Sequence, residues 1–153
     1  MDEYRSQLFV AFIAALEQKN IRYCILGGYE TYPEEIPSDV DFMVLPEQFP
    51  ELYRILQSLA KANGAKLVQA LQHETTACYY VWVKIAEDNL VFLHPDASSD
   101  YRRKGRVWLS AKEMLSSRRL HPNGFYIPAP EYGFIYYLIK KSFVEILTIE
   151  NLL

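Results

Sequence analysis

The alternation of apolar and polar residues predicts helices and strands that follow one another along the chain. Residues 3–19 carry apolar side chains at helical spacing, which predicts an amphipathic helix ending before Asn20. Residues 46–64 predict a second helix, with Gly64 just past its end as a C-cap. The β-rich runs lie at 21–28, 39–45, 65–73, 77–86 and 89–95, and the last three are expected to extend the sheet in antiparallel fashion.

The last third of the chain adds two helices and a short strand. Ser110 and Glu113 form a capping-box pattern at the start of a short helix, and residues 123–130 predict a turn and a short strand. Pro130 opens a helix that stays apolar almost to the last residue. Such a helix must be buried against its own domain, a second copy of the chain or a further segment, so we expect a homo-oligomer as one outcome.

Composition bounds the class of protein. The chain has 153 residues, half of them apolar, which predicts a single α+β domain over 1–153 with a mixed β-sheet flanked by helices. The net charge of −3 does not favour a nucleic-acid partner. No targeting segment or run long enough to span a bilayer occurs, and both cysteines lie in apolar runs, which predicts a cytoplasmic protein without a membrane partner.

Asp39 and Asp41 interrupt an otherwise apolar strand. Residues two apart in a strand face the same side, so the two carboxylates project together while Val40 and Phe42 face the core. Like charges repel unless a cation lies between them, and carboxylate oxygens suit Mg²⁺ or Mn²⁺. The alternative is a surface strand without a ligand, because Asp-x-Asp is common by chance.

Gly27 and Gly28 end the strand that precedes this pair. Glycine allows the backbone to approach an anionic group closely and to present N–H groups to it. A phosphate group beside a metal ion would use both the glycines and the carboxylates. The two features together predict phosphoryl or nucleotidyl transfer.

The glycine pair, the polar loop and the strand "SDVDFMV" resemble the signature of the nucleotidyltransferase superfamily of the DNA polymerase β type. More narrowly, residues 23–44 and 92–115 resemble the nucleotidyltransferase-like proteins associated with bacterial surface-polysaccharide genes. The resemblance covers most of the chain, and its first motif is the specific part. It implies a nucleotidyltransferase-like fold, a nucleoside triphosphate as substrate and Mg²⁺ or Mn²⁺ as cofactor.

The resemblance also implies roles for individual residues. Asp39 and Asp41 would bind the metal ions, and Asp96 matches the third carboxylate, which would bind metal and help the acceptor hydroxyl lose its proton. Pro95 precedes that carboxylate, and since proline has no N–H we expect Asp96 at a strand end or edge.

The glycine pair departs from the usual pattern of the superfamily. Gly27 and Gly28 would hold the β and γ phosphates, although the superfamily usually has serine at the second position. Ser38, next to the metal pair, is the substitute that this chain offers.

Three basic residues complete the predicted nucleotide-binding set. Arg102 and Arg103 belong to a basic cluster that could meet a triphosphate or an anionic acceptor, or could form a solvated loop. Lys84 lies in an apolar strand, so it either faces solvent or points into the cleft. His94 would share a side with Asp96.

The sequence therefore predicts metal-dependent transfer of a nucleoside monophosphate from an NTP to a hydroxyl or phosphate acceptor. The acceptor, a small molecule or a protein, is left open. A non-catalytic module that keeps the fold for nucleotide binding or protein interaction is one alternative. A toxin–antitoxin type nucleotidyltransferase that modifies a partner protein is another.

Overall fold

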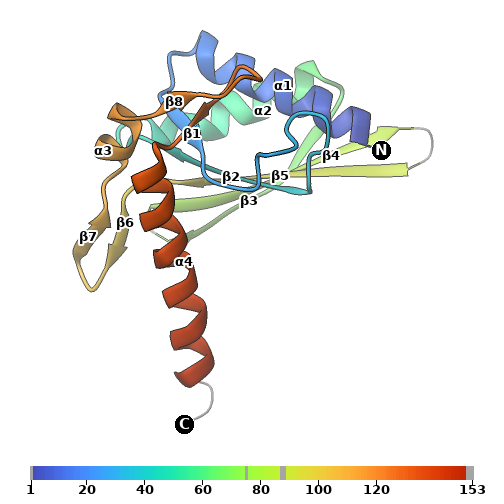
Figure 1. Ribbon diagram of the computed structural model, residues 1–153. Helices are drawn as coiled ribbons and strands as arrows, with labels where there is room; N and C mark the ends of the chain where they lie inside the picture. Colours follow the sequence, from blue (N-terminus) through green and yellow to red (C-terminus); the bar gives the residue numbers. More distant parts are fainter. Residues whose placement is uncertain (1, 75, 87–88, 151–153) are drawn as a thin grey trace.

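A five-stranded mixed sheet in the order β1-β2-β5-β4-β3 lies at the centre of the fold (Figure 1). The computed structural model describes residues 2–74, 76–86 and 89–150. The sheet consists of β1 (Tyr23–Ile25), β2 (Asp39–Val44), β3 (Lys66–Glu74), β4 (Ala77–Ala86) and β5 (Asn89–Ser98). Strands β2 and β5 pair in parallel, and the other neighbours are antiparallel. The predicted α+β class with a mixed, helix-flanked sheet is confirmed.

Two helices cover one face of the sheet (Figure 1). They are α1 (Asp2–Gln18) and α2 (Leu52–Ala62), the latter preceded by the 3-10 turn η1 (Phe49–Glu51). The apolar stripe of α1 packs on the alternate residues of the strands: the Phe12 ring meets Phe42 edge-on at 4.9 Å and Trp82 at 6.0 Å between ring centroids. All three side chains are fully buried, so this face holds the larger core.

The opposite face is covered only beside β1 and β2. There α3 (Ala111–Ser116) and α4 (Pro130–Glu150) pack a second buried cluster that includes Cys24, Met43 and Met114. The predicted capping box is present in part, because the Ser110 side chain accepts a hydrogen bond from the Glu113 backbone N–H at 3.4 Å. Within residues 2–150, as far as the structure describes them, no helix covers the remainder of this face over β5 and β4 (Figure 1).

Helix α4 leaves the body of the protein and runs away from the sheet (Figure 1). Tyr136 and Ile139 face the second core, whereas Phe134 and Tyr137 are more than half exposed. The expected burial of this helix against its own domain therefore holds for one side of its first half. The side chains of residues 142–150 lie outside the described part, so the homo-oligomer stays a prediction. No helix of the described residues is both long and apolar enough to cross a bilayer.

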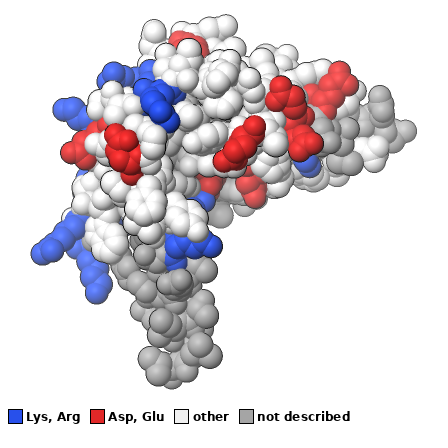
Figure 2. Space-filling view, viewed as in Figure 1, with Lys and Arg blue, Asp and Glu red and all other residues white. Residues whose placement is uncertain are grey.

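Two small hairpins complete the fold. They consist of β6 (Tyr101–Arg103) with β7 (Arg106–Leu109), and β8 (Arg119–Leu120) with β9 (Tyr126–Ile127). Lys104 and Gly105 have φ values of 48° and 76°, as a two-residue hairpin turn requires. The basic cluster thus lies on a hairpin rather than in an irregular loop, and Figure 2 shows Lys and Arg side chains projecting from the side of the molecule where Figure 1 places β6 and β7.

Strand β5 occupies the middle of the sheet, which corrects the expectation for Asp96. Proline was expected to confine that residue to a strand end or edge, yet β5 pairs on both sides. The pairing with β4 is interrupted opposite Pro95: it reaches Tyr79–Asp96 and resumes at Trp82–Leu93. The missing N–H of proline therefore falls at a gap in the ladder, where no hydrogen bond is lost.

Candidate functional site

The parallel pairing of β2 with β5 brings the predicted carboxylates together. Asp41 lies opposite Asp96 in the register, and Asp39 lies opposite His94. Because side chains alternate along a strand, these four residues share the face that α1 and α2 leave uncovered, while Val40 points into the core. The resulting group of three aspartates and one histidine belongs to two adjacent strands at the open part of the sheet.

Gly27 and Gly28 lie at the end of the neighbouring strand β1. The last hydrogen bond before them runs from the Leu26 N–H to the Asp41 carbonyl oxygen at 3.0 Å, so the glycines follow directly beside the start of β2. Gly28 has a φ of 68°, which a residue with a Cβ rarely adopts. Apart from the adjacent residues in the chain, no atom of the described residues lies within 4 Å of a Cβ built on either glycine, so the backbone can be approached there by a ligand.

Asp41 is held by two side chains of α4. The Tyr136 hydroxyl donates a hydrogen bond to Asp41 Oδ2 at 3.1 Å, and the Lys140 ammonium pairs with the same oxygen. Tyr136 is buried and also shares a hydrogen bond with the half-buried Tyr101. Burial, followed by the nearby Tyr101 and Asp41, raises the pKa of Tyr136 far above its ordinary value, so this hydroxyl stays protonated as a donor.

Asp39 is the more exposed of the pair and contacts an imidazole. Its Oδ1 lies 2.9 Å from His94 Nδ1, and its side chain is 65% exposed, against 29% for Asp41. The His94 ring lies between the rings of Tyr79 and Phe92, at centroid distances of 5.3 Å and 6.1 Å. Asp39 therefore has its carboxylate at the solvent side of the group and one aromatic-flanked partner.

The donor set fits Mg²⁺ or Mn²⁺ in type, because carboxylate oxygens are the ligands that both ions prefer. Asp39 and Asp41 are the residues that would hold the ion, and one or two carboxylates with phosphate oxygens and water make a usual Mg²⁺ shell. Among the residues that the structure describes, no three His, Cys, Asp or Glu side chains converge closely enough to hold a metal ion by themselves. A ligand's phosphate oxygens would have to supply the rest of the shell.

The structure brings only part of the predicted nucleotide-binding set to this group. Ser38 precedes Asp39 at the start of β2, and its carbonyl accepts a hydrogen bond from the His94 N–H. Lys84 lies on the other face of the sheet, since it pairs with the buried Val91, and its ammonium sits 4.9 Å from the centre of the Tyr4 ring on α1. The prediction that it points into the cleft is therefore not met.

On the basic hairpin, Arg102 pairs with a carboxylate outside the predicted set. The Arg102 guanidinium pairs with Asp100 at 3.0 Å, and the other Asp100 oxygen accepts the Ala111 N–H at the start of α3. Arg102 thus takes part in holding the hairpin to α3. Its predicted role in nucleotide binding stays a prediction, and the side chain of Arg103 lies outside the described part of the chain.

Sequence reasoning missed the two contacts from α4. Tyr136 and Lys140 are separated by 95 and 99 residues from Asp41, and no local pattern connects residues that far apart. The sequence does place Tyr136 and Lys140 four residues apart in a mostly apolar helix, and this spacing puts the hydroxyl and the ammonium on the same side of that helix.

Comparison with solved structures places the fold among known ones. JHP933 from Helicobacter pylori aligns with a TM-score of 0.53 and 15% sequence identity over 85% of this chain and 53% of that chain. A second Helicobacter pylori structure, described as a candidate nucleotidyltransferase, aligns with a TM-score of 0.49 and 18% identity over 83% of this chain and 53% of that chain. No protein-family model and no curated protein sequence matches the chain. The chain spans about half the length of both structures, and the first likeness shows a shared fold alone.

Proposed function

We propose that the chain is a nucleotidyltransferase domain of the DNA polymerase β type. It binds a nucleoside triphosphate with Mg²⁺ or Mn²⁺ on the open face of the sheet and transfers the nucleoside monophosphate to a hydroxyl or phosphate acceptor. The observation that carries the proposal is the register of two parallel strands. It sets Asp96 beside Asp41, with Asp39 two residues along on the same face.

The glycine pair supports the same assignment. Gly27 and Gly28 follow β1 beside the start of β2, and the space around both Cα atoms is open. Backbone N–H groups in such a position can bind phosphate oxygens without a side chain in the way. Carboxylates for a cation and a glycine turn for phosphates thus lie on neighbouring strands.

In this reaction the acceptor oxygen attacks the α-phosphorus of the NTP. A new P–O bond forms, the bond between the α-phosphorus and the bridging oxygen breaks, and pyrophosphate leaves with that oxygen. Asp96 would accept the proton of the acceptor hydroxyl. A bound divalent ion supplies charge neutralisation of the phosphates, and Asp39 and Asp41 would hold it.

Binding without turnover is the second candidate function. The Lys140 ammonium pairs with Asp41, so one carboxylate already has a cationic partner in this structure. A chain that only holds a nucleotide would need the fold and the two β2 aspartates but no proton acceptor at Asp96. A chain that only contacts another protein would need the fold. Transfer to a partner protein, as in toxin–antitoxin systems, differs in requiring that partner for activity.

Thermal unfolding with each of the four NTPs, with and without Mg²⁺ or Mn²⁺, tests the binding step. A ligand that binds only the native state raises its melting temperature, by about 5 °C at a concentration of roughly 100 Kd. The shift should require the divalent ion. It should disappear in a variant with Asp39→Asn and Asp41→Asn, because the two charges that attract the ion are gone.

The matched control carries Glu47→Gln and Glu51→Gln. Both residues are exposed and lie near the N-terminus of α2, on the other side of the sheet. This control should keep the full shift. If the aspartate variant binds NTP and metal as the wild type does, the site assignment is wrong. A variant with Asp96→Asn that still binds NTP but no longer transfers the nucleotide would favour transfer over binding alone.

A further inference from the structure

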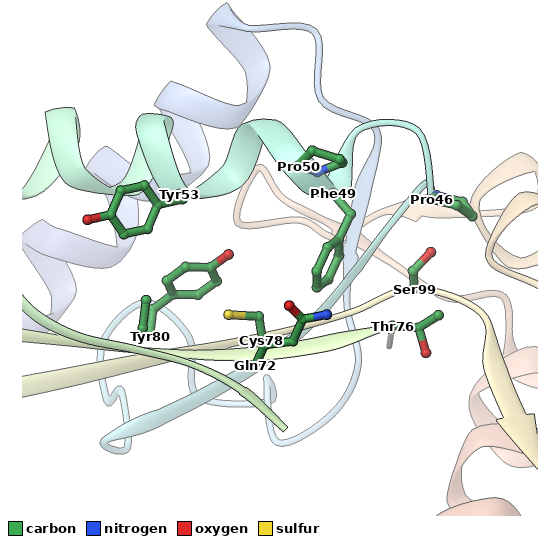
Figure 3. A pocket seen from close by; sticks show the side chains of 10 residues that line it. Pro46, Phe49, Pro50, Tyr53, Gln72, Thr76, Cys78, Tyr80 and Ser99 are labelled. Carbon is green, nitrogen blue, oxygen red and sulfur yellow. The ribbon is translucent and has the colours of Figure 1, made fainter. Parts of the chain in front are cut away.

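A pocket of about 530 Å³ lies on the helix-covered face of the sheet (Figure 3). Phe49, from the turn before α2, and Tyr53, from the first turn of α2, form its roof. Cys78 and Tyr80, two residues apart on β4, form its floor. Ser99, just past the end of β5, closes one end. Ala70 and Gln72 of β3 form a wall, so four separate segments of the chain build one concave site.

The floor of the pocket is buried, and its rim at Tyr53 is exposed to solvent. Ser99, Tyr80 and Cys78 are only 1%, 3% and 8% exposed, whereas Tyr53 at the rim is 46% exposed. A volume of this size lies within the usual range for small-molecule sites. The gradient from a buried floor to an exposed rim provides both an entry and a place where a ligand would lose its water.

The lining is aromatic and uncharged. Figure 3 shows the rings of Phe49, Tyr53 and Tyr80 around the cavity, and none of the described residues that line it is Lys, Arg, His, Asp or Glu. Burial raises the pKa of the Cys78 thiol and of the Tyr80 hydroxyl, which share a hydrogen bond, so both groups stay neutral at physiological pH. A charged ligand would have no partner at this floor.

The buried Ser99 hydroxyl has no hydrogen-bond partner among the described residues. The Ser99 backbone N–H, by contrast, donates to the Thr76 carbonyl oxygen at 2.8 Å, and the Thr76 hydroxyl donates to the Asp100 carbonyl oxygen at 2.9 Å. A buried polar group without a partner is rare in folded proteins, and here it belongs to a residue that lines the cavity.

We propose that this pocket binds a small uncharged aromatic heterocycle whose polar edge pairs with the Ser99 hydroxyl and whose flat face packs against Phe49, the ring that lies between Ser99 and the two tyrosines in Figure 3. A nucleobase-like ring has this combination of a flat apolar face and an edge of donors and acceptors. The Gln72 side chain, also at the wall, offers a further amide partner.

The site is distinct from the carboxylate group. Tyr79 separates Cys78 from Tyr80 on β4 and points to the opposite face, where it pairs with Asp96. An NTP bound at Asp39 and Asp41 therefore lies across the sheet from this pocket. The inference stands without the proposed nucleotidyl transfer, and the two can fail separately.

The test is ligand binding observed by NMR with adenine and uracil as heterocycle probes and N-acetylglucosamine as a sugar control. Titration to about 5 mM covers the affinities expected for such small probes. The heterocycles should shift the backbone amide signals of Gln72, Tyr80 and Ser99. The sugar should leave them in place.

Two variants locate the binding, each judged by circular dichroism to be folded. Ala70→Trp adds a large ring at an exposed β3 position that lines the pocket, and it should weaken binding by about tenfold or more. Ser99→Ala removes the unpaired hydroxyl without changing the volume much, and it should weaken binding by about fivefold. Leu71→Trp, half exposed on the other face of the same strand, is the matched control and should change nothing.

The outcomes separate cleanly. Loss of binding in Ala70→Trp and Ser99→Ala, with binding retained in Leu71→Trp and in Asp39→Asn with Asp41→Asn, supports the pocket as a heterocycle site. Failure of both heterocycles to shift the pocket signals overturns it. So does equal binding by N-acetylglucosamine, or binding that Ala70→Trp leaves unchanged.

Discussion

Lys140 of α4 places its ammonium on the carboxylate of Asp41 in β2. One helical turn earlier, the Tyr136 hydroxyl donates a hydrogen bond to the same oxygen. The C-terminal helix therefore fixes the orientation of one of the two β2 aspartates. The helix also places the Lys140 ammonium at the carboxylate that would attract a divalent ion.

Lys140→Met should raise the affinity of the protein for Mn²⁺ in the absence of nucleotide, by about tenfold, because an ammonium and a metal ion compete for the same carboxylate. The free Mn²⁺ signal in electron paramagnetic resonance measures this. Since the Lys140 side chain is 53% exposed, its effect on the free energy of unfolding should stay within about 1 kcal/mol. Lys141→Met is the control, because that lysine lies over the Tyr137 ring instead; equal affinities in the two variants would rule out the competition.

Tyr136→Phe should lower the free energy of unfolding by about 1–2 kcal/mol. The change removes a buried hydroxyl that donates to Asp41 and shares a hydrogen bond with Tyr101, and it leaves the Tyr101 hydroxyl with one partner fewer. Urea denaturation measures the difference. Tyr137→Phe, at a position that is 55% exposed, should stay within about 0.5 kcal/mol of the wild type. Similar losses in both variants would show that the hydroxyl at 136 has no special role.

Phe42→Ala should cost about 3–5 kcal/mol of unfolding free energy, because it opens a cavity under the Phe12 ring in the larger core. Phe134→Ala, where the ring is 61% exposed on α4, should cost far less. Chemical denaturation of the two variants compares them directly. A small loss for Phe42→Ala would contradict the assignment of alternate β2 residues to the core face.

The protein should lose stability as the pH rises from about 10 to about 12. Burial raises the pKa of Tyr32 and of Tyr101 from 10.0 to about 12. The native state then holds these protons more tightly than the unfolded state, so the stabilisation is complete below about pH 10 and is lost as the pH passes the folded values. Urea midpoints measured across this range, with tyrosinate absorbance recorded in parallel, check the slope.

Tyr101→Phe supplies the comparison for the alkaline experiment. It removes one of the shifted hydroxyls, so its stability should fall less steeply between about pH 10 and 12 than that of the wild type. Tyr53→Phe, at an exposed ring, should keep the wild-type slope. A slope that is unchanged in Tyr101→Phe would indicate that other groups control the alkaline transition.

Local pattern was sufficient for most elements. The apolar stripe of 3–19 gave α1, the capping residue Ser110 marked the start of α3, and Gly27-Gly28 marked the end of β1. Such features depend on neighbours within a few residues, so the chain itself contains all the information that they need. The hairpin β6–β7 was not predicted, because a run of charged residues conceals its strand pattern.

By itself the sequence determined that Asp39 and Asp41 share a face, because strand alternation follows from backbone geometry alone. Only the tertiary structure decided what surrounds them. The pairing of β2 with β5 set Asp96 beside Asp41, the register of β4 turned Lys84 to the other face, and the docking of α4 delivered Tyr136 and Lys140. These contacts join residues far apart in the chain, and they form only when the hydrophobic faces of separate elements are buried together.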